Sequence, residues 1–198
     1  ADLGSGPLQN PQMHLAEAFL QVLAVREDHG VQQALLQLCD ALQAQFIEPQ
    51  HGLMLEKPRG AVDNWFEPGH QFEWFYLLDT SALLRETPLH ASIARAFDYA
   101  EQCGVKDSAV LAMLAVDGKV IDATQRIWAQ AEYLRALVLR AGSEAKLAAQ
   151  LRALEQRFLH DGGWYECRDS EGAVSRHDMP STTPYHLATC LEGLQRLS

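Results

Sequence analysis

The chain has 198 residues, of which 47% are hydrophobic and 21% are charged, and its formal net charge is −10. This composition is ordinary for a globular domain with a sizeable core. The negative charge argues against binding to a nucleic-acid backbone, and no apolar run reaches the roughly 18 residues of a membrane span.

The N-terminal sequence and the cysteines predict the compartment. Residues 1–6 lack an initiator Met and the basic and apolar regions of a signal peptide, so we expect a processed or cut end. The cysteines do not have the spacing of a zinc site; they are Cys39, Cys103, Cys167 and Cys190. We therefore predict free thiols and a cytoplasmic location.

Helical hydrophobic spacing dominates the first half of the chain. Asn10 is the predicted N-cap of the first helix, Pro11 its first residue and Gly30 its end. Further helices are expected over residues 31–46, 70–84 and 89–102. Residues 47–69 are rich in Pro and Gly and predict a long loop, a feature that is often functional in a compact domain.

The second half continues the helical pattern. Asp107 is expected to cap a short helix over residues 108–116, and Ser143 a longer helix that ends near residue 159. Other helices are expected over residues 123–139 and 184–197. Residues 161–165 predict a turn followed by extended chain. This order predicts an all-α fold of stacked antiparallel helix pairs, with the loops gathered on one face.

Three histidines share one local position, the first turn of a predicted helix beside a loop: His14, His70 and His186. Glu17 and Glu73 each follow one of them at a spacing that places both side chains on one helical face. A histidine there can reach a cavity, and its ordinary pKa of about 6.5 suits proton transfer near neutral pH. The alternative is a structural helix start, where a Glu is favourable by about 0.3–1 kcal/mol.

Aromatic and polar side chains near these histidines suit a sugar, which presents apolar C–H faces and hydroxyl groups. Trp74 lies one turn beyond His70 and shares its face, and Gln130 follows Trp128 closely. Arg59, in the long loop, would anchor a hydroxyl or a carboxylate. Core packing for the tryptophans and a solvated Arg59 are the alternatives.

Other chemistries have little support in the sequence. No phosphate loop, no Gly-x-Ser-x-Gly elbow and no cysteine nucleophile motif is found. The remaining histidines are predicted to be surface residues; they are His29, His51, His90, His160 and His177.

Five segments, in order along the chain, resemble landmarks of the N-acylglucosamine 2-epimerase superfamily. They are Asn10-Pro-Gln-Met-His-Leu-Ala-Glu-Ala18, Pro68-Gly-His-Gln-Phe-Glu-Trp74, Trp128-Ala-Gln-Ala-Glu132, Gly162-Gly-Trp164 and Tyr185-His186. The resemblance implies an (α/α)6 barrel, in which a ring of outer helices surrounds a ring of inner helices and the site lies at one end.

The resemblance also implies proton transfer without a metal or another cofactor. One histidine removes the C2 proton of an open-chain aldose and gives a cis-enediolate. A second histidine returns a proton to C2 in an epimerase, whereas the proton returns to C1 in an aldose–ketose isomerase. The matching catalytic positions are His70 and His186. His14, Arg59, Glu73 and Trp128 match substrate-binding or support positions, and we predict that Trp74 and Gln130 also bind the substrate.

Members of this superfamily are considerably longer, and the matched segments belong to their C-terminal half. We therefore expect residues 1–198 to form one domain that makes about half of the barrel. Half a barrel exposes apolar helix faces, which a soluble monomer rarely tolerates. We accordingly expect either a fragment, or closure of the barrel by a second copy or by a separate N-terminal half.

Several functions remain open from the sequence. Residues 179–186 favour an aldose–ketose isomerase of the mannose isomerase type, acting on an unphosphorylated sugar. The first alternative is a sugar 2-epimerase. The others are a metal enzyme that uses the His-x-x-Glu pairs, and a catalytically inactive fragment or binding module.

Overall fold

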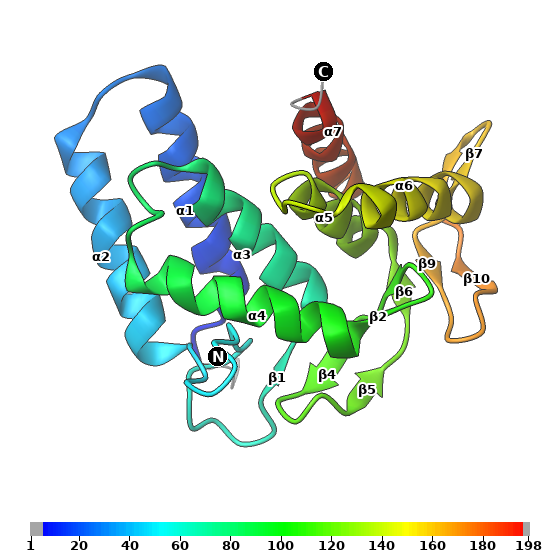
Figure 1. Cartoon of the computed structure of the whole chain (residues 1–198), viewed down its shortest axis with the longest axis horizontal. Helices are drawn as coiled ribbons and strands as arrows, with labels where there is room; N and C mark the ends of the chain where they lie inside the picture. Colours follow the sequence, from blue (N-terminus) through cyan, green and yellow to red (C-terminus); the bar gives the residue numbers. More distant parts are fainter. Residues whose placement is uncertain (1–5, 196–198) are drawn as a thin grey trace, which may run out of the picture.

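The structure, a computed structural model, describes residues 6–195 and is mainly helical (Figure 1). The helices are α1 (Gln9–Val25), α2 (His29–Gln45), α3 (Pro68–Thr80), α4 (Pro88–Gly104), α5 (Ile127–Leu137), α6 (Glu144–Phe158) and α7 (Thr183–Leu194). The strands are β1 (Trp65–Phe66), β2 (Val105–Lys106), β3 (Ala109–Val110), β4 (Met113–Ala115), β5 (Val120–Asp122), β6 (Gln125–Arg126), β7 (Leu159–His160), β8 (Gly163–Trp164), β9 (Cys167–Arg168) and β10 (Val174–Arg176).

The helices form an inner and an outer row. Every residue of α3 from Pro68 to Leu78 is buried, and so is every residue of α5. Helices α4 and α6 bury only one face; in α6 this face consists of Gln150, Leu154 and Phe158. A helix that is buried all round has neighbours on every side, so α3 and α5 are inner helices and α4 and α6 cover them from outside.

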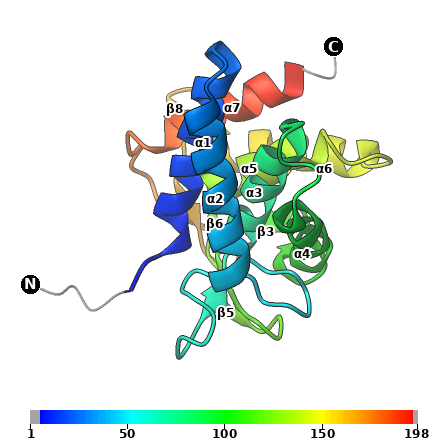
Figure 2. The same ribbon diagram turned by 90° about the vertical axis from the view of Figure 1, so that its left-hand side faces the viewer.

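Helices α1 and α7 border the open side of this arrangement. Only a few of their residues are buried, among them Met13 in α1 and Cys190 in α7. A groove of about 630 Å³ is lined by residues of both helices, including Gln21 and Thr189. In Figure 1 α1 lies to the left of α3 and α7 lies above α5, and in Figure 2 α1 and the start of α7 lie to the left of α3 and α5.

Short strands hold the N-terminal ends of the inner helices. Strand β1 leads into α3 and pairs with β4, which also pairs with β5. Strand β6 leads directly into α5 and pairs with β9, whose other neighbour is β10. The starts of α3 and α5 are therefore held in place by strand pairing and do not follow free loops.

The predicted helix over residues 108–116 is wrong, because this segment forms β3 and β4. Asp107 and Ser108 have positive φ values of 49° and 59° and form the turn between β2 and β3. Two successive left-handed residues match the turn of a two-residue hairpin and cannot continue a right-handed helix. Asp107 is therefore a turn residue and not a helix cap.

Several helix boundaries also differ from the prediction. The first helix starts at Gln9, and Asn10 directs its side chain to His70 instead of capping. Gly30 lies inside the first turn of α2, whose cap is Asp28, because the Asp28 side chain accepts from the Val31 N–H. The third helix ends at Thr80, the helix after residue 122 starts only at Ile127, and Ser143 makes no capping hydrogen bond.

All four cysteines are free, as predicted, and Cys103 is the one that is only partly buried. His29, His160 and His177 are exposed, as expected. His51 and His90 are half-buried instead, because the His51 ring stacks on Tyr99 at 3.8 Å and His90 Nε2 lies 3.1 Å from Asp79 Oδ1. Among residues 6–195, no helix combines the length and the apolar character needed to cross a bilayer.

Candidate active site

The three predicted histidines line one cavity. It measures about 250 Å³ and lies where the N-terminal ends of α1, α3, α5 and α7 meet. Besides His14, His70 and His186, its walls contain Asn10, Glu67, Glu73, Arg126, Trp128, Glu166, Thr182 and Thr183. Residues that are far apart in the sequence therefore converge on one site.

His70 sits in the first turn of α3 and is only 4% exposed. Its Nδ1 atom lies 2.7 Å from Oε1 of Glu56, which is itself 5% exposed. On the other edge of the ring, Asn10 Nδ2 lies 3.2 Å from His70 Nε2. The imidazole is thus held on both edges, and Nε2 is the nitrogen next to a residue of the cavity wall.

The acidic surroundings raise the pKa of His70. Burial by itself lowers this pKa, but the charge of Glu56, its hydrogen bond, and the charges of Glu67 and Glu73 outweigh burial and raise it from 6.5 to about 9. The pKa of Glu67 is raised as well, mainly by burial. Near neutral pH the imidazole of His70 is therefore protonated and can act first as an acid.

His186 has a parallel arrangement at the start of α7. Its Nδ1 atom lies 2.7 Å from Oε1 of Glu132, a fully buried carboxylate of α5. The other oxygen of Glu132 lies 2.6 Å from Nη2 of Arg135, and this contact is an ion pair without hydrogen-bond alignment. Arg135 also lies over the Tyr76 ring at 4.3 Å. The carboxylate is thus charge-compensated on one side and holds the histidine on the other.

Trp128 lies close to both His70 and His186. Its ring centroid is 5.0 Å from that of His70 and 5.4 Å from that of His186. A Cβ atom on Gly69 would lie 2.7 Å from the Trp128 ring and 2.8 Å from the Ala129 Cβ. Glycine at this position therefore permits the close approach of α3 and α5 that brings His70 to the indole.

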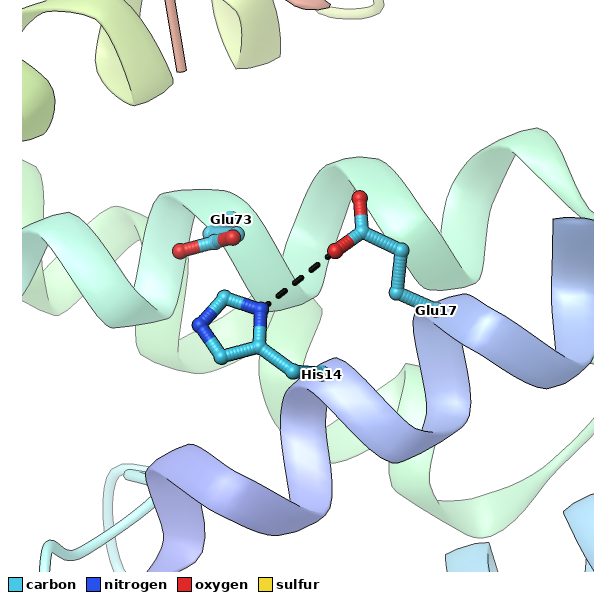
Figure 3. Close-up of side chains that lie close together, drawn as sticks. All are labelled: His14, Glu17 and Glu73. Atoms are coloured by element: carbon cyan, nitrogen blue, oxygen red, sulfur yellow. Dashed lines mark hydrogen bonds and ion pairs between the residues drawn. The ribbon is translucent and has the colours of Figure 1, made fainter. Parts of the chain in front are cut away.

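Glu73 lies at the centre of the acidic groups. Figure 3 shows this side chain of α3 near the His14 ring of α1, with His14 Nδ1 3.4 Å from Glu17 Oε2. Glu73 is fully buried, and neither of its carboxyl oxygens has a hydrogen-bond partner among the described residues. Burial, followed by the charge of Glu132, raises the pKa of Glu73 well above its ordinary value. This shift favours the protonated carboxyl group, which can donate a hydrogen bond into the cavity.

Trp74, Gln130 and Arg59 do not line the cavity. The Trp74 indole N–H donates to Gln9 Oε1 at 2.8 Å, within the core. The Gln130 amide accepts from and donates to the backbone of Val110 at 2.8 and 2.9 Å, and so ties α5 to β3. The Arg59 guanidinium donates to backbone carbonyls near the end of α2, at Ala44 and Ile47.

Glu56 and Asn10 were not predicted as site residues from the sequence. Glu56 follows the buried run from Leu53 to Leu55, and a carboxylate directly after such a run is a usable signal. Asn10 belongs to the segment that was interpreted as a cap. Glu166 was also missed; its carboxylate accepts from the Thr183 hydroxyl at 2.8 Å and anchors the start of α7.

Within residues 6–195, three groups of side chains have the composition of a metal site. They are His14 with Glu17 and Glu73, Glu56 with Glu67 and His70, and Glu73 with Glu132 and His186, and in each group the ligand-type atoms lie within 4.8 Å. In the second and third groups a carboxylate already holds the histidine Nδ1 atom. The arrangement therefore favours proton transfer at the opposite ring nitrogens.

Comparisons with known proteins give a family and a fold. Residues 5–190 match the family described as N-acylglucosamine 2-epimerase. A mannose-6-phosphate isomerase of Rhizobium meliloti (strain 1021) is 30% identical over 94% of this chain and 54% of its own length. Among solved structures, a D-mannose isomerase is 23% identical, with a TM-score of 0.76 over 96% of this chain and 56% of the other. The cellobiose 2-epimerase from Bacillus thermoamylovorans B4167 is 19% identical, with a TM-score of 0.83 over 97% and 54%.

The chain therefore spans about half the length of the relatives that it matches. The two rows of helices, with α3 and α5 inside and α4 and α6 outside, make about half of an (α/α)6 barrel. The family match extends over residues 5–190 and includes the five landmark segments in their expected order. The chain therefore belongs to the N-acylglucosamine 2-epimerase family.

Proposed function

We propose that this chain carries the proton-transfer site of a sugar isomerase or epimerase that acts at C1 and C2 of an unphosphorylated sugar. One observation carries the proposal. His70 and His186 both lie next to the Trp128 ring, and the Nδ1 atom of each contacts a buried carboxylate. Two oriented imidazoles around an aromatic platform suit proton transfer to and from the carbon atoms of a sugar.

The raised pKa of His70 suggests that this histidine acts as the acid. His186 removes the proton on C2 of the open-chain aldose, and protonated His70 stabilises the oxygen that gains charge as the cis-enediolate forms. In an isomerisation the proton returns to C1, while a proton passes from the C2 hydroxyl to the C1 oxygen. In an epimerisation His70 delivers its Nε2 proton to C2 from the opposite face, and His186 retains the proton that it removed.

Three further residues are proposed to bind the sugar. Trp128 offers a ring face to the apolar C–H groups. The protonated Glu73 donates to a hydroxyl or carbonyl oxygen, since its carboxyl group has no partner among the described residues. His14 is exposed at the cavity wall and contacts a hydroxyl group.

The charge of the cavity wall favours an unphosphorylated sugar. Apart from the histidines, Arg126 is the only basic residue among those that line it, whereas Glu67 and Glu166 are acidic. The charge of protonated His70 is compensated by Glu56, 2.7 Å from its Nδ1 atom. The Arg126 guanidinium is already 3.8 Å from Glu67. A phosphate group needs cations or free N–H donors, so it would be poorly held here.

Within this class we favour an aldose–ketose isomerase of the mannose isomerase type. The segment from Met179 to His186 and the similarity to a D-mannose isomerase support this choice. A sugar 2-epimerase is the second candidate, supported by the similarity to cellobiose 2-epimerase.

NMR of mannose incubated with the protein in heavy water tests the proposal. A 2-ketose with deuterium at C1 supports the isomerase, and a C2 epimer with deuterium at C2 supports the epimerase. Absence of both products, with an intact fold, would favour an inactive binding module. Full activity in EDTA would contradict the metal-enzyme alternative, whereas loss that one metal ion reverses would support it.

We propose that further residues of the same protein, a second copy of this chain, or a separate chain supply the remaining half of the barrel. The groove between α1 and α7 is the side on which further inner helices would pack. Light scattering after size exclusion distinguishes self-association from a monomer. We also propose a cytoplasmic location, which fractionation of cells would test.

A further inference from the structure

A line of buried hydrogen bonds leads away from His70 into the core. It joins four side chains from α1, α3 and the loop before α3. The Trp74 indole N–H donates to Gln9 Oε1 at 2.8 Å, Gln9 Nε2 donates to both oxygens of Glu56 at 3.1 Å, and Glu56 Oε1 lies 2.7 Å from His70 Nδ1. Trp74 and Gln9 have no exposed surface, so water does not compete for these bonds.

The chemistry of each group determines which atom donates and which accepts in these hydrogen bonds. An indole nitrogen can only donate, so Trp74 must face the carbonyl oxygen of the Gln9 amide. This contact turns the amide NH₂ group of Gln9 toward Glu56. The backbone supports the same placement, because the Gln9 N–H donates to the Glu56 carbonyl oxygen at 3.2 Å.

The Glu56 carboxylate can only accept, so its contact with His70 requires a proton on Nδ1. Gln9 Nε2 also lies 2.9 Å from His70 Nδ1, and these two nitrogens are donors that share one carboxylate. Neutral His70 therefore carries its hydrogen on Nδ1, and Nε2 is left unprotonated beside Asn10 in the cavity wall.

We propose that Trp74, Gln9 and Glu56 form a positioning relay that fixes the tautomer of His70, so that only Nε2 exchanges a proton with the substrate. The role of His70 rests on the proposed function, whereas the tautomer itself does not. This inference explains why Trp74 lies in the core and outside the cavity, although it is one turn from His70. It also gives a function to Gln9, which lies outside the landmark segments.

Several charged groups besides Glu56 surround His70. The acidic groups around His70 are Glu56 at 2.7 Å, Glu67 at 4.0 Å and Glu73, and Arg126 faces Glu67 at 3.8 Å. Only Glu56 contacts Nδ1 within hydrogen-bond distance and is also bonded to Gln9. Loss of the relay should therefore change the tautomer without removing the other charges.

The chain offers a matched pair of tryptophans for the test. Trp74→Phe removes the indole N–H that orients Gln9. Trp65→Phe removes an indole N–H that is buried without a partner among the described residues, and Trp65 does not line the cavity. Gln9→Met is the second relay variant, since it keeps the side-chain length and removes the side-chain hydrogen bonds to Trp74 and to Glu56. Glu56→Gln removes the carboxylate charge.

Nitrogen NMR of labelled protein, with the His70 signals assigned from a His70→Gln variant, reports the tautomer and the pKa. Above pH 9, where His70 is neutral, we expect the Nδ1–H form in the wild type and in Trp65→Phe. Trp74→Phe and Gln9→Met should populate the Nε2–H form, and Glu56→Gln should lower the pKa of His70 by about 1–3. A wild-type Nε2–H form, or unchanged spectra in both Trp74→Phe and Gln9→Met, would overturn the relay.

Turnover separates this inference from the proposed function. If the wild type converts a sugar, Trp74→Phe should lower kcat by about two- to tenfold, the value of one net hydrogen bond, with little change in KM and none in Trp65→Phe. If the wild type shows the Nδ1–H form and its loss in the relay variants but converts no sugar, the relay stands and the proposed function fails. Equal kcat for the two Trp→Phe variants would contradict the relay.

Discussion

The imidazole Nδ1 of His186 lies 2.7 Å from Oε1 of Glu132, which α5 presents to the start of α7. The partner of this carboxylate on its other side is Arg135, only 2% exposed. Glu132 therefore connects two functions, because it orients a histidine of the site and compensates a buried cation of the core.

Glu132→Gln should accordingly reduce both turnover and stability. Loss of the orienting charge should lower kcat by about 10²–10⁴, by analogy with the loss of the carboxylate from a Ser-His-Asp triad. Arg135 loses its buried partner, which should cost about 3–5 kcal/mol of unfolding free energy. Steady-state kinetics and urea unfolding measure the two effects. The exposed Glu144→Gln is the control, and an E132Q variant as stable and active as the control would refute both roles.

His70→Ala and His186→Ala should each reduce turnover by about 10²–10⁴, since each removes one general acid or base. Exchange of the C2 proton with heavy water should fall along with product formation. The exposed His160→Ala provides the matched control. Near-full turnover by either variant would exclude that histidine from the reaction.

His70 should make the unfolding free energy depend on pH. Its pKa is raised from 6.5 to about 9 in the folded protein, so its stabilising contribution is complete below pH 6.5 and is lost as the pH rises to about 9. The full contribution is about 3 kcal/mol. Glu73 acts with the same sign, because its pKa is also raised on folding.

Urea unfolding between pH 6 and pH 9.5 measures this slope. Glu56→Gln should flatten it, because the group that raises the pKa of His70 most is lost, whereas Glu144→Gln should leave it unchanged. A wild-type free energy that is constant over this range would show that the pKa of His70 is not raised.

Glu73→Gln should leave the fold intact, since an amide resembles the protonated carboxyl group that the burial of Glu73 requires. Stability at high pH should rise relative to the wild type, because no buried carboxylate has to ionise. Turnover should fall if the acidic proton is needed. Thermal unfolding at pH 6 and pH 9 together with kinetics tests this, and unchanged turnover would limit Glu73 to a structural role.

The sequence by itself determined the helical class and the grouping of the histidines. Apolar spacing located α2, α4 and α6 to within a few residues, because one-sided burial follows the helical period. His14, His70 and His186 were recognisable because each occupies a first turn beside a loop, and helix starts that meet at one end place such residues together.

Only the tertiary structure decided which neighbours these histidines have. Glu56 reaches His70 from an irregular loop, and no periodicity describes where such a loop passes. Trp74 shares the helix of His70, yet its direction depends on Gln9 of another helix, so the local spacing misplaced it at the sugar. Asp107 and Ser108 show the same limit on a smaller scale: two left-handed residues and strand pairing outweighed a local pattern that favours a helix, because pairing partners are non-local.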